Sequence, residues 1–239
     1  MTNQRRKSIR RSLPPLHICF NCGNLEATTL DHVISKTLIP EPGPNNLVTV
    51  PACEECNQSF SKDEEYLRDR LSAAVGGVDF DPPKTWDKAW RSMRRPEARG
   101  KKISMFKDVL KLPGAVETKH GPSDVGIVME KRRVDRVVGK MIRGFYFYHF
   151  KKPLGDVSIE IDILSNISAR GDRKALIDWI KTVYDAPTWA QNFGPDTSVV
   201  CALADADGRV GIWAIKIMGQ HIIVAVVAPH GHFDRHQSD

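Results

Sequence analysis

The chain has 239 residues, of which 41% are hydrophobic and 27% are charged. A chain of this length can bury a sizeable core, and this composition is close to that of ordinary globular proteins. It excludes a wholly disordered chain, a collagen-like repeat and a membrane-embedded protein. The longest apolar run, residues 222–228, is far shorter than the roughly 20 residues of a membrane-spanning helix. No signal-peptide pattern follows the basic N-terminus, so we expect a cytoplasmic protein with no membrane partner.

The formal net charge of +6 is unevenly distributed along the chain. Residues 1–16 contain five basic residues and no acidic residue, and residues 84–111 contain ten basic residues against three acidic ones. Clustered positive charge favours a polyanion such as nucleic acid as the partner. A solubilising tail and a solvated helix face would give the same pattern, so charge alone leaves both interpretations open.

Four of the five cysteines form two pairs, each with two intervening residues. Cys19 and Cys22 form the first pair, and Cys53 and Cys56 form the second. This spacing lets a tight turn direct both thiolates at one ion, and two such pairs complete a tetrahedral zinc site. Two unrelated pairs of buried thiols are the alternative. We predict structural zinc here, and we expect Cys201 to be a small buried residue of a strand.

The residues around these pairs predict two strands and a helix. Residues 28–34 and 47–50 have the composition of strands, and residues 40–46 are rich in proline and glycine, as a connecting loop is. After the second cysteine pair, residues 61–64 have the pattern of a capping box at the start of a helix. Zinc would therefore attach a β-hairpin to a helix.

Four polar residues lie within this predicted hairpin and helix: Asp31, His32, Asn46 and Asn57. Combined with the cysteine pairs, the order Asp-His, Asn-Leu and Cys-x2-Cys-Asn resembles the HNH nucleases, which are built on the ββα-metal fold. The resemblance covers residues 19 to about 72, and asparagine replaces histidine at the third signature position. It implies a metal-dependent endonuclease that hydrolyses phosphodiester bonds in nucleic acid, with DNA favoured over RNA.

The resemblance also implies a role for each polar residue. His32 is the expected general base, since a histidine of ordinary pKa, about 6.5, can accept a proton from water near neutral pH. Asp31 and Asn57 are the expected ligands of a catalytic divalent ion, Mg²⁺ or Mn²⁺, because both offer oxygen donors. Asn46 is expected to hold the loop and orient His32. Neighbouring strand residues point to opposite faces, so Asp31 and His32 can serve one phosphate only if the strand bends or bulges.

The candidate nucleic-acid contacts are basic residues in the helix after the second cysteine pair and in the second basic stretch: Lys62, Lys88, Arg91, Arg94 and Arg95. In the resembled family a lysine often stands three residues after the third signature position, where this chain has Phe60. Lys62 or residues 84–111 would have to replace it. Two alternatives to a DNA endonuclease stay open, namely a zinc-dependent nucleic-acid-binding protein that does not cleave, and a ribonuclease.

Beyond residue 130, apolar periodicity predicts a small α+β domain with an antiparallel sheet. The predicted elements are helices over 134–148 and 172–184 and strands over 157–163, 198–204, 210–218 and 221–228. This half contains no second active-site motif, and its candidate roles are a homodimer interface and the binding of a regulatory partner.

The predicted fold class is therefore α+β, with a zinc-clipped ββα-metal module before the small α+β domain. The expected segments are a basic disordered tail (1–16), the HNH module (17–76), a basic linker rich in proline and glycine with a short helix (77–130), the C-terminal α+β domain (131–229) and a second tail (230–239).

Overall fold

In the computed structural model, the described residues are 18–24, 26–73, 89, 91–92, 94–111, 117–118, 121–122, 125–164, 181, 183, 185, 187–219 and 221–231. The predicted basic tail, most of the predicted helix over 172–184 and the candidate contact Lys88 lie outside them. Within these ranges, no helix combines the length and the apolar character that crossing a bilayer requires.

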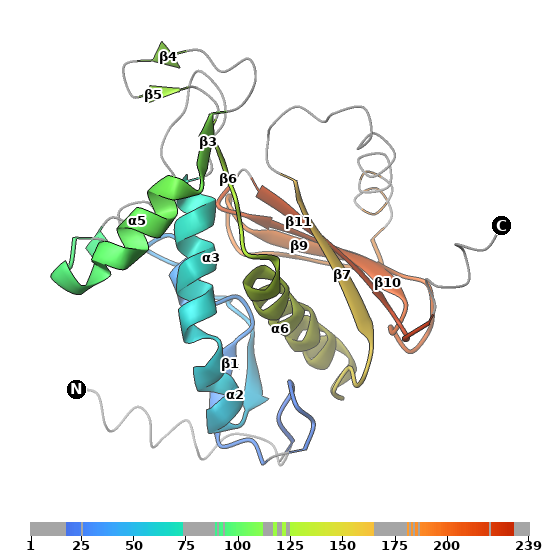
Figure 1. The fold of residues 1–239 in the computed structure, drawn as a ribbon. Helices are drawn as coiled ribbons and strands as arrows, with labels where there is room; N and C mark the ends of the chain where they lie inside the picture. The colour runs from blue at the N-terminus through green and yellow to red at the C-terminus, as the bar shows by residue number, and fades with distance from the viewer. Residues whose placement is uncertain are drawn as a thin grey trace.

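The fold is mixed α+β, and one long helix, α6 (Lys131–Phe150), occupies its centre. A two-stranded hairpin and the helices α2 and α3 lie on one side of α6, and a five-stranded sheet lies on the other (Figure 1). The apolar positions of α6 recur every three or four residues, as at Val137, Met141 and Phe145, but residues 140–142 and 144–147 are also buried, so the helix is covered on more than one side. This helix was predicted over 134–148 and is confirmed with a slightly greater length.

The hairpin consists of β1 (Thr29–His32) and β2 (Thr49–Ala52), which pair antiparallel, with a short 3-10 helix, η1 (Lys36–Leu38), in the connection. Two helices follow, α2 (Glu54–Ser59) and α3 (Ser61–Ala73). The predicted capping box is wrong. Ser61 is the first residue of α3 and its hydroxyl donates to the Gln58 carbonyl oxygen, while the carboxylate of Glu64 turns to α6.

The large sheet is antiparallel throughout, with the strand order β7-β11-β10-β9-β8. The strands are β7 (Ser158–Leu164), β8 (Trp189–Asn192), β9 (Ser198–Leu203), β10 (Gly211–Ile217) and β11 (His221–Ala228). The sequence predicted four of them, and β8 is the additional one. Aromatic rings fix the sheet on α6, because the Phe145 ring lies 5.6 Å from Trp189 and 6.4 Å from Trp213 between centroids.

The segment expected to be a linker contains regular structure. It includes a 3-10 turn, η2 (Pro96–Ala98), followed by the helix α5 (Arg99–Lys107). Two short antiparallel pairs that the sequence did not predict are also present: β3 (Val109–Lys111) with β6 (Val125–Ile127), and β4 (Glu117–Thr118) with β5 (Gly121–Pro122). Basic residues of this segment thus lie on α5 and on the residues that precede it.

The main hydrophobic cluster includes residues from the hairpin side, from α6 and from the sheet. The hairpin approaches α6 closely at Gly144, where an added Cβ atom would lie 2.8 Å from a methyl carbon of Val33. Only a residue without a side chain permits that approach. The segments predicted as two domains therefore contribute to one continuous core around α6.

Candidate functional site

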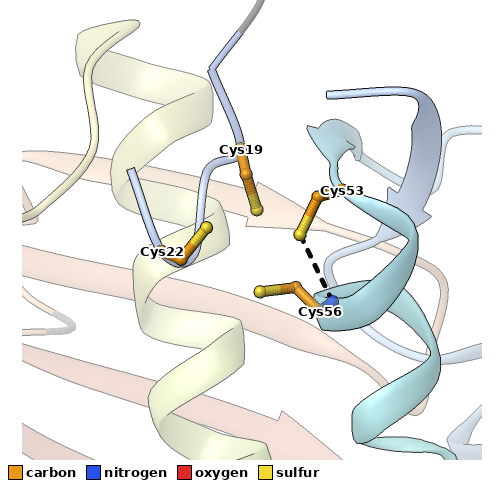
Figure 2. Close-up of side chains that lie close together, drawn as sticks. All are labelled: Cys19, Cys22, Cys53 and Cys56. Atoms are coloured by element: carbon orange, nitrogen blue, oxygen red, sulfur yellow. Dashed lines mark hydrogen bonds between the residues drawn. The ribbon is translucent and has the colours of Figure 1, made fainter. Parts of the chain in front are cut away.

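The four predicted zinc ligands converge beside the start of α2 (Figure 2). Cys19 and Cys22 come from the loop before β1, and Cys53 and Cys56 come from the junction of β2 and α2. Their Sγ atoms all lie within 4.8 Å of one another. Four thiolates about 2.3 Å from a tetrahedral zinc ion would stand roughly 3.8 Å apart, so the cluster has the dimensions of a metal site. Among the described residues it is the only such group of histidine, cysteine and carboxylate side chains.

The surrounding backbone suits this cluster. Gly23 has a φ of +70°, which lets the chain turn sharply after Cys22, and its amide donates to the Cys19 carbonyl oxygen at 2.9 Å. The amide of Cys56 and the side-chain amide of Asn21 donate to sulfur atoms of the cluster, at 3.4 and 3.5 Å. Donors that point at sulfur stabilise thiolates, so the cluster can hold a metal ion such as zinc.

In the absence of a metal ion, burial disfavours the charged thiolate form of these cysteines and so favours the protonated thiol. It raises the pKa of Cys19 and raises the pKa of Cys56 to about 12. A zinc ion binds the deprotonated form, so its binding must displace the thiol protons. Metal affinity at the cluster should therefore increase with pH.

Asp31, an expected ligand of the catalytic ion, is buried and already paired with a cation. The ammonium group of Lys140, from the middle of α6, donates a hydrogen bond to its Oδ1 atom at 3.0 Å and lies 2.9 Å from its Oδ2 atom as an ion pair, without hydrogen-bond geometry to that oxygen. The same ammonium lies 2.6 Å from Oε1 of Glu64 on α3. Burial raises the pKa of the Asp31 carboxyl, and the ion pair with Lys140 opposes that shift. We call Asp31, Glu64 and Lys140 the Lys140 cluster.

His32, the expected general base, is half-buried at the end of β1, and its Nδ1 atom is buried without a hydrogen-bond partner. Burial lowers the pKa of His32, and the positive charges of Lys36 and Lys140 lower it further. The imidazole is therefore neutral at neutral pH and has a lone pair with which to accept a proton.

The bend that a shared phosphate would require between Asp31 and His32 is not formed. The β1–β2 register is continuous, with Asp31 opposite Val50 and His32 opposite Thr49, and the Val33 amide continues it by donating to the Val48 carbonyl oxygen. Side chains alternate along such a strand. Asp31 and His32 therefore leave the backbone on opposite faces.

The two asparagines have separate partners. The side-chain amide of Asn57, on α2, donates to the Thr29 hydroxyl at 3.0 Å and so ties α2 to the start of β1. The side-chain amide of Asn46 donates to the Asn192 carbonyl oxygen at the end of β8, at 2.8 Å. Asn46 thus fastens the loop between the strands to the large sheet, and this contact does not involve His32.

Lys140 belongs to a row of basic residues that the sequence analysis did not single out. Arg133 and Arg136 both pair with Asp63, and Lys140 pairs with the neighbouring Glu64. Positions 133, 136 and 140 are three and four residues apart, so they share one face of α6. That spacing was visible in the sequence, but their acidic partners on α3 were not.

The expected divalent ion does not fit Asp31 as the residues stand. Both carboxylate oxygens are within 3.0 Å of a buried ammonium group. At an effective dielectric constant of about 20, two unit charges 4 Å apart interact by about 4 kcal/mol, and a doubly charged ion would meet about twice that repulsion. Asn57, the other expected ligand, offers a neutral amide that cannot offset such repulsion, and its side-chain amide donates to Thr29.

The described candidate contacts for nucleic acid, Lys62, Arg91, Arg94 and Arg95, are all exposed. Arg91 and Arg95 line a hollow of about 500 Å³ together with Lys36 and Arg68, against two acidic side chains. Lys36 is also close enough to His32 to lower its pKa. The structure therefore connects part of the basic segment to the neighbourhood of His32.

Comparisons of the chain with protein-family models, with curated proteins and with solved structures found no match. The likeness to the HNH nucleases thus depends on the cysteine pairs and the polar residues quoted above. The geometry establishes a mixed α+β fold and a four-cysteine cluster at the start of a helix.

Proposed function

We propose that this protein is a zinc-stabilised HNH-type endonuclease that hydrolyses phosphodiester bonds, with DNA as the favoured substrate and His32 as the general base. The observation that carries the proposal is the buried Nδ1 atom of His32, which has no hydrogen-bond partner. A buried polar atom without a partner is costly, and a water molecule or a ligand can supply the missing hydrogen bond. His32 lies at one end of the β1–β2 hairpin, and the cysteine cluster lies at the other end.

The proposed step is general-base hydrolysis. Neutral His32 accepts a proton from a water molecule, the water oxygen bonds to phosphorus, and the bond from phosphorus to the leaving oxygen breaks; the leaving oxygen keeps the electron pair and takes a proton from solvent. The burial that lowers the pKa of His32 keeps this base in its neutral form. Phosphates that flank the reacting group would be bound by the basic hollow of Lys36, Arg91 and Arg95.

The resemblance also assigns a divalent Mg²⁺ or Mn²⁺ ion to Asp31 and Asn57. Because the ammonium of Lys140 already contacts both oxygens of Asp31, we assign no step to such an ion. The role of zinc in the proposal is structural, since four protein ligands leave no open position for water.

A second candidate, a zinc-dependent nucleic-acid-binding protein that does not cleave, is favoured by the Lys140 cluster and by the unbent β1 strand. It would use the same cysteines and the same basic hollow. A ribonuclease is a variant of the first candidate, because the proposed step does not involve a 2′-hydroxyl group.

The test compares purified wild-type protein with His32→Ala on plasmid DNA, single-stranded DNA and structured RNA. Each is incubated with Mg²⁺, with Mn²⁺ or without added divalent ions. Cleavage by the wild type and none by His32→Ala, at equal zinc content, is expected, and the substrate that is lost separates a deoxyribonuclease from a ribonuclease. His230→Ala is the matched control, since His230 is exposed and paired with Asp156.

Equal cleavage by the wild type and His32→Ala would contradict the assignment of the base. Salt-dependent binding without cleavage in every reaction would favour the second candidate.

A further inference from the structure

The Lys140 cluster places a positive charge where the resembled nucleases hold a metal ion. The Lys140 side chain is 2% exposed and its ammonium lies between two carboxylates, 2.6 Å from Glu64 and 2.9 Å from Asp31. Burying a charged amine is costly unless opposite charges surround it. The two acids supply that environment, and they come from β1 and α3, elements far apart from α6 in the sequence.

The charges around this position balance without an added ion. Arg133, Arg136 and Lys140 on α6 face three acids, Asp63 and Glu64 on α3 and Asp31 on β1. The Phe60 ring, whose centroid lies 5.6 Å from the Lys140 ammonium, covers the cluster on a further side. A divalent ion at Asp31 would therefore add uncompensated positive charge to a group whose charges already balance and whose Asp31–Lys140–Glu64 part is buried.

The surroundings of Lys140 also keep its side chain from moving away from Asp31 and Glu64. Lys140 lies in the middle of α6, next to fully buried core residues such as Met141 and one turn before Gly144, where even an added Cβ atom would lie 2.8 Å from Val33. A long lysine side chain at a surface position can move aside, but here α3 and β1 cover it.

We propose that Lys140 is the resident cation of this site, which takes the place of a divalent ion, so that Asp31 binds no Mg²⁺ or Mn²⁺. Asp31 is then a positioning residue that fixes β1, and with it His32, against α6. This inference concerns the cation alone, and it holds whether or not the protein cleaves nucleic acid.

The test is Mn²⁺ binding by the full-length, zinc-loaded protein, followed by the electron paramagnetic resonance signal of free Mn²⁺. We expect no saturable binding by the wild type and the same titration for Asp31→Asn. Lys140→Met should gain one Mn²⁺ per chain, because Asp31 and Glu64 lose their counter-ion, and adding Asp31→Asn should abolish that binding. Lys152→Met is the matched control, since it removes a lysine from an exposed pair with Asp207.

Saturable Mn²⁺ binding by the wild type that Asp31→Asn abolishes would overturn the proposal. A folded Lys140→Met protein that binds no Mn²⁺ would overturn it as well. If Lys140→Met does not fold, the wild type and Asp31→Asn decide the question. No chelator is used, because a chelator would also remove zinc. The result is separate from the cleavage test, in which only His32 is changed.

Discussion

The hairpin side of the molecule and the five-stranded sheet are stabilised by different kinds of interaction. The sheet is stabilised by apolar side chains such as Trp213 and Ile215, which alternate along its strands and pack on α6. The hairpin has only two short strands, and a two-stranded hairpin is marginal on its own. Other groups compensate for this, with a cysteine cluster that could hold a metal ion at one end and the Lys140 cluster at the other.

This difference predicts where the protein is fragile. Losing one methyl-sized group from an apolar core costs only about 1 kcal/mol, because many contacts share the stabilisation. A metal site or a buried ion cluster depends on each member, because removing one leaves the others uncompensated. The predictions below test that contrast, beginning with the largest effect.

The largest effect is expected from Cys53→Ala. Structural zinc contributes about 10–16 kcal/mol of apparent binding free energy in small zinc domains, which is as large as the whole stability of a typical domain. Loss of zinc should therefore unfold the hairpin side. Cys201→Ala is the matched control in β9, where removing one buried sulfur should cost about 1 kcal/mol and leave zinc content unchanged. Zinc analysis and thermal unfolding measure both, and equal losses of stability would contradict the contrast.

The next effect concerns pH and His221, the first residue of β11. Its Nε2 atom lies 2.8 Å from the Leu71 carbonyl oxygen on α3, and burial lowers its pKa to about 4. Since the folded pKa is below the unfolded value of about 6.5, folding favours the neutral ring. This contribution is complete above pH 6.5 and is lost as the pH falls towards 4, by about 3 kcal/mol in total.

Denaturant unfolding at several pH values measures this loss. His221→Gln keeps a side-chain N–H donor but does not titrate in this range, so its stability should fall less steeply between about pH 6.5 and 4. Equal slopes for the wild type and the variant would contradict the assignment to His221.

A smaller loss is expected at Gly144, where the hairpin side meets α6. In Gly144→Ala, the new Cβ atom would lie 2.8 Å from Val33, and we expect overpacking to cost about 2 kcal/mol. Gly139→Ala is the matched control on the same helix. Its Cβ would meet only an ordinary contact at 3.9 Å, so helix propensity should make it neutral or stabilising by up to about 1 kcal/mol. Val33→Ala should relieve this overpacking, so the double variant should lose less stability than the sum of the two single variants in a double-mutant cycle.

The smallest effect is expected from Arg91→Ala combined with Arg95→Ala, which should leave stability unchanged. If both residues contact phosphates, the slope of log affinity for DNA against log salt should decrease by about 2. Lys151→Ala with Lys152→Ala removes the same charge from the C-terminal end of α6. An equal change in both double variants would mean that net charge, and not the hollow, controls binding.

Much of the sheet could be predicted from sequence, because alternation reports directly which side chains are buried. The apolar periodicity of residues 157–163, 210–218 and 221–228 located β7, β10 and β11. β8 was missed because its four residues, Trp189–Asn192, are few and half polar, and their pairing depends on β9. Short strands that are specified by a neighbour carry little signal of their own.

For the site, the cysteine spacing predicted the cluster because two residues between ligands already determine a turn. The state of Asp31 could not be predicted in this way. It depends on Lys140, which is 109 positions away in the sequence and reads as an ordinary polar position of a helix. Because α3 packs on α6 and buries Lys140, this lysine becomes the counter-ion of Asp31. A contact of that kind cannot be predicted without knowing how α3 packs on α6.

The place of Lys140 on α6 also has a consequence for how this protein can be divided or recombined. A fragment ending at residue 76 would carry Asp31 and Glu64 without the lysine between them, and Val33 without the helix that covers it. Fused to another protein, that fragment would contain two carboxylates, Asp31 and Glu64, without their counter-ion. The segment that resembles a nuclease therefore depends on α6 for its structure, and we do not expect it to fold as a separate module.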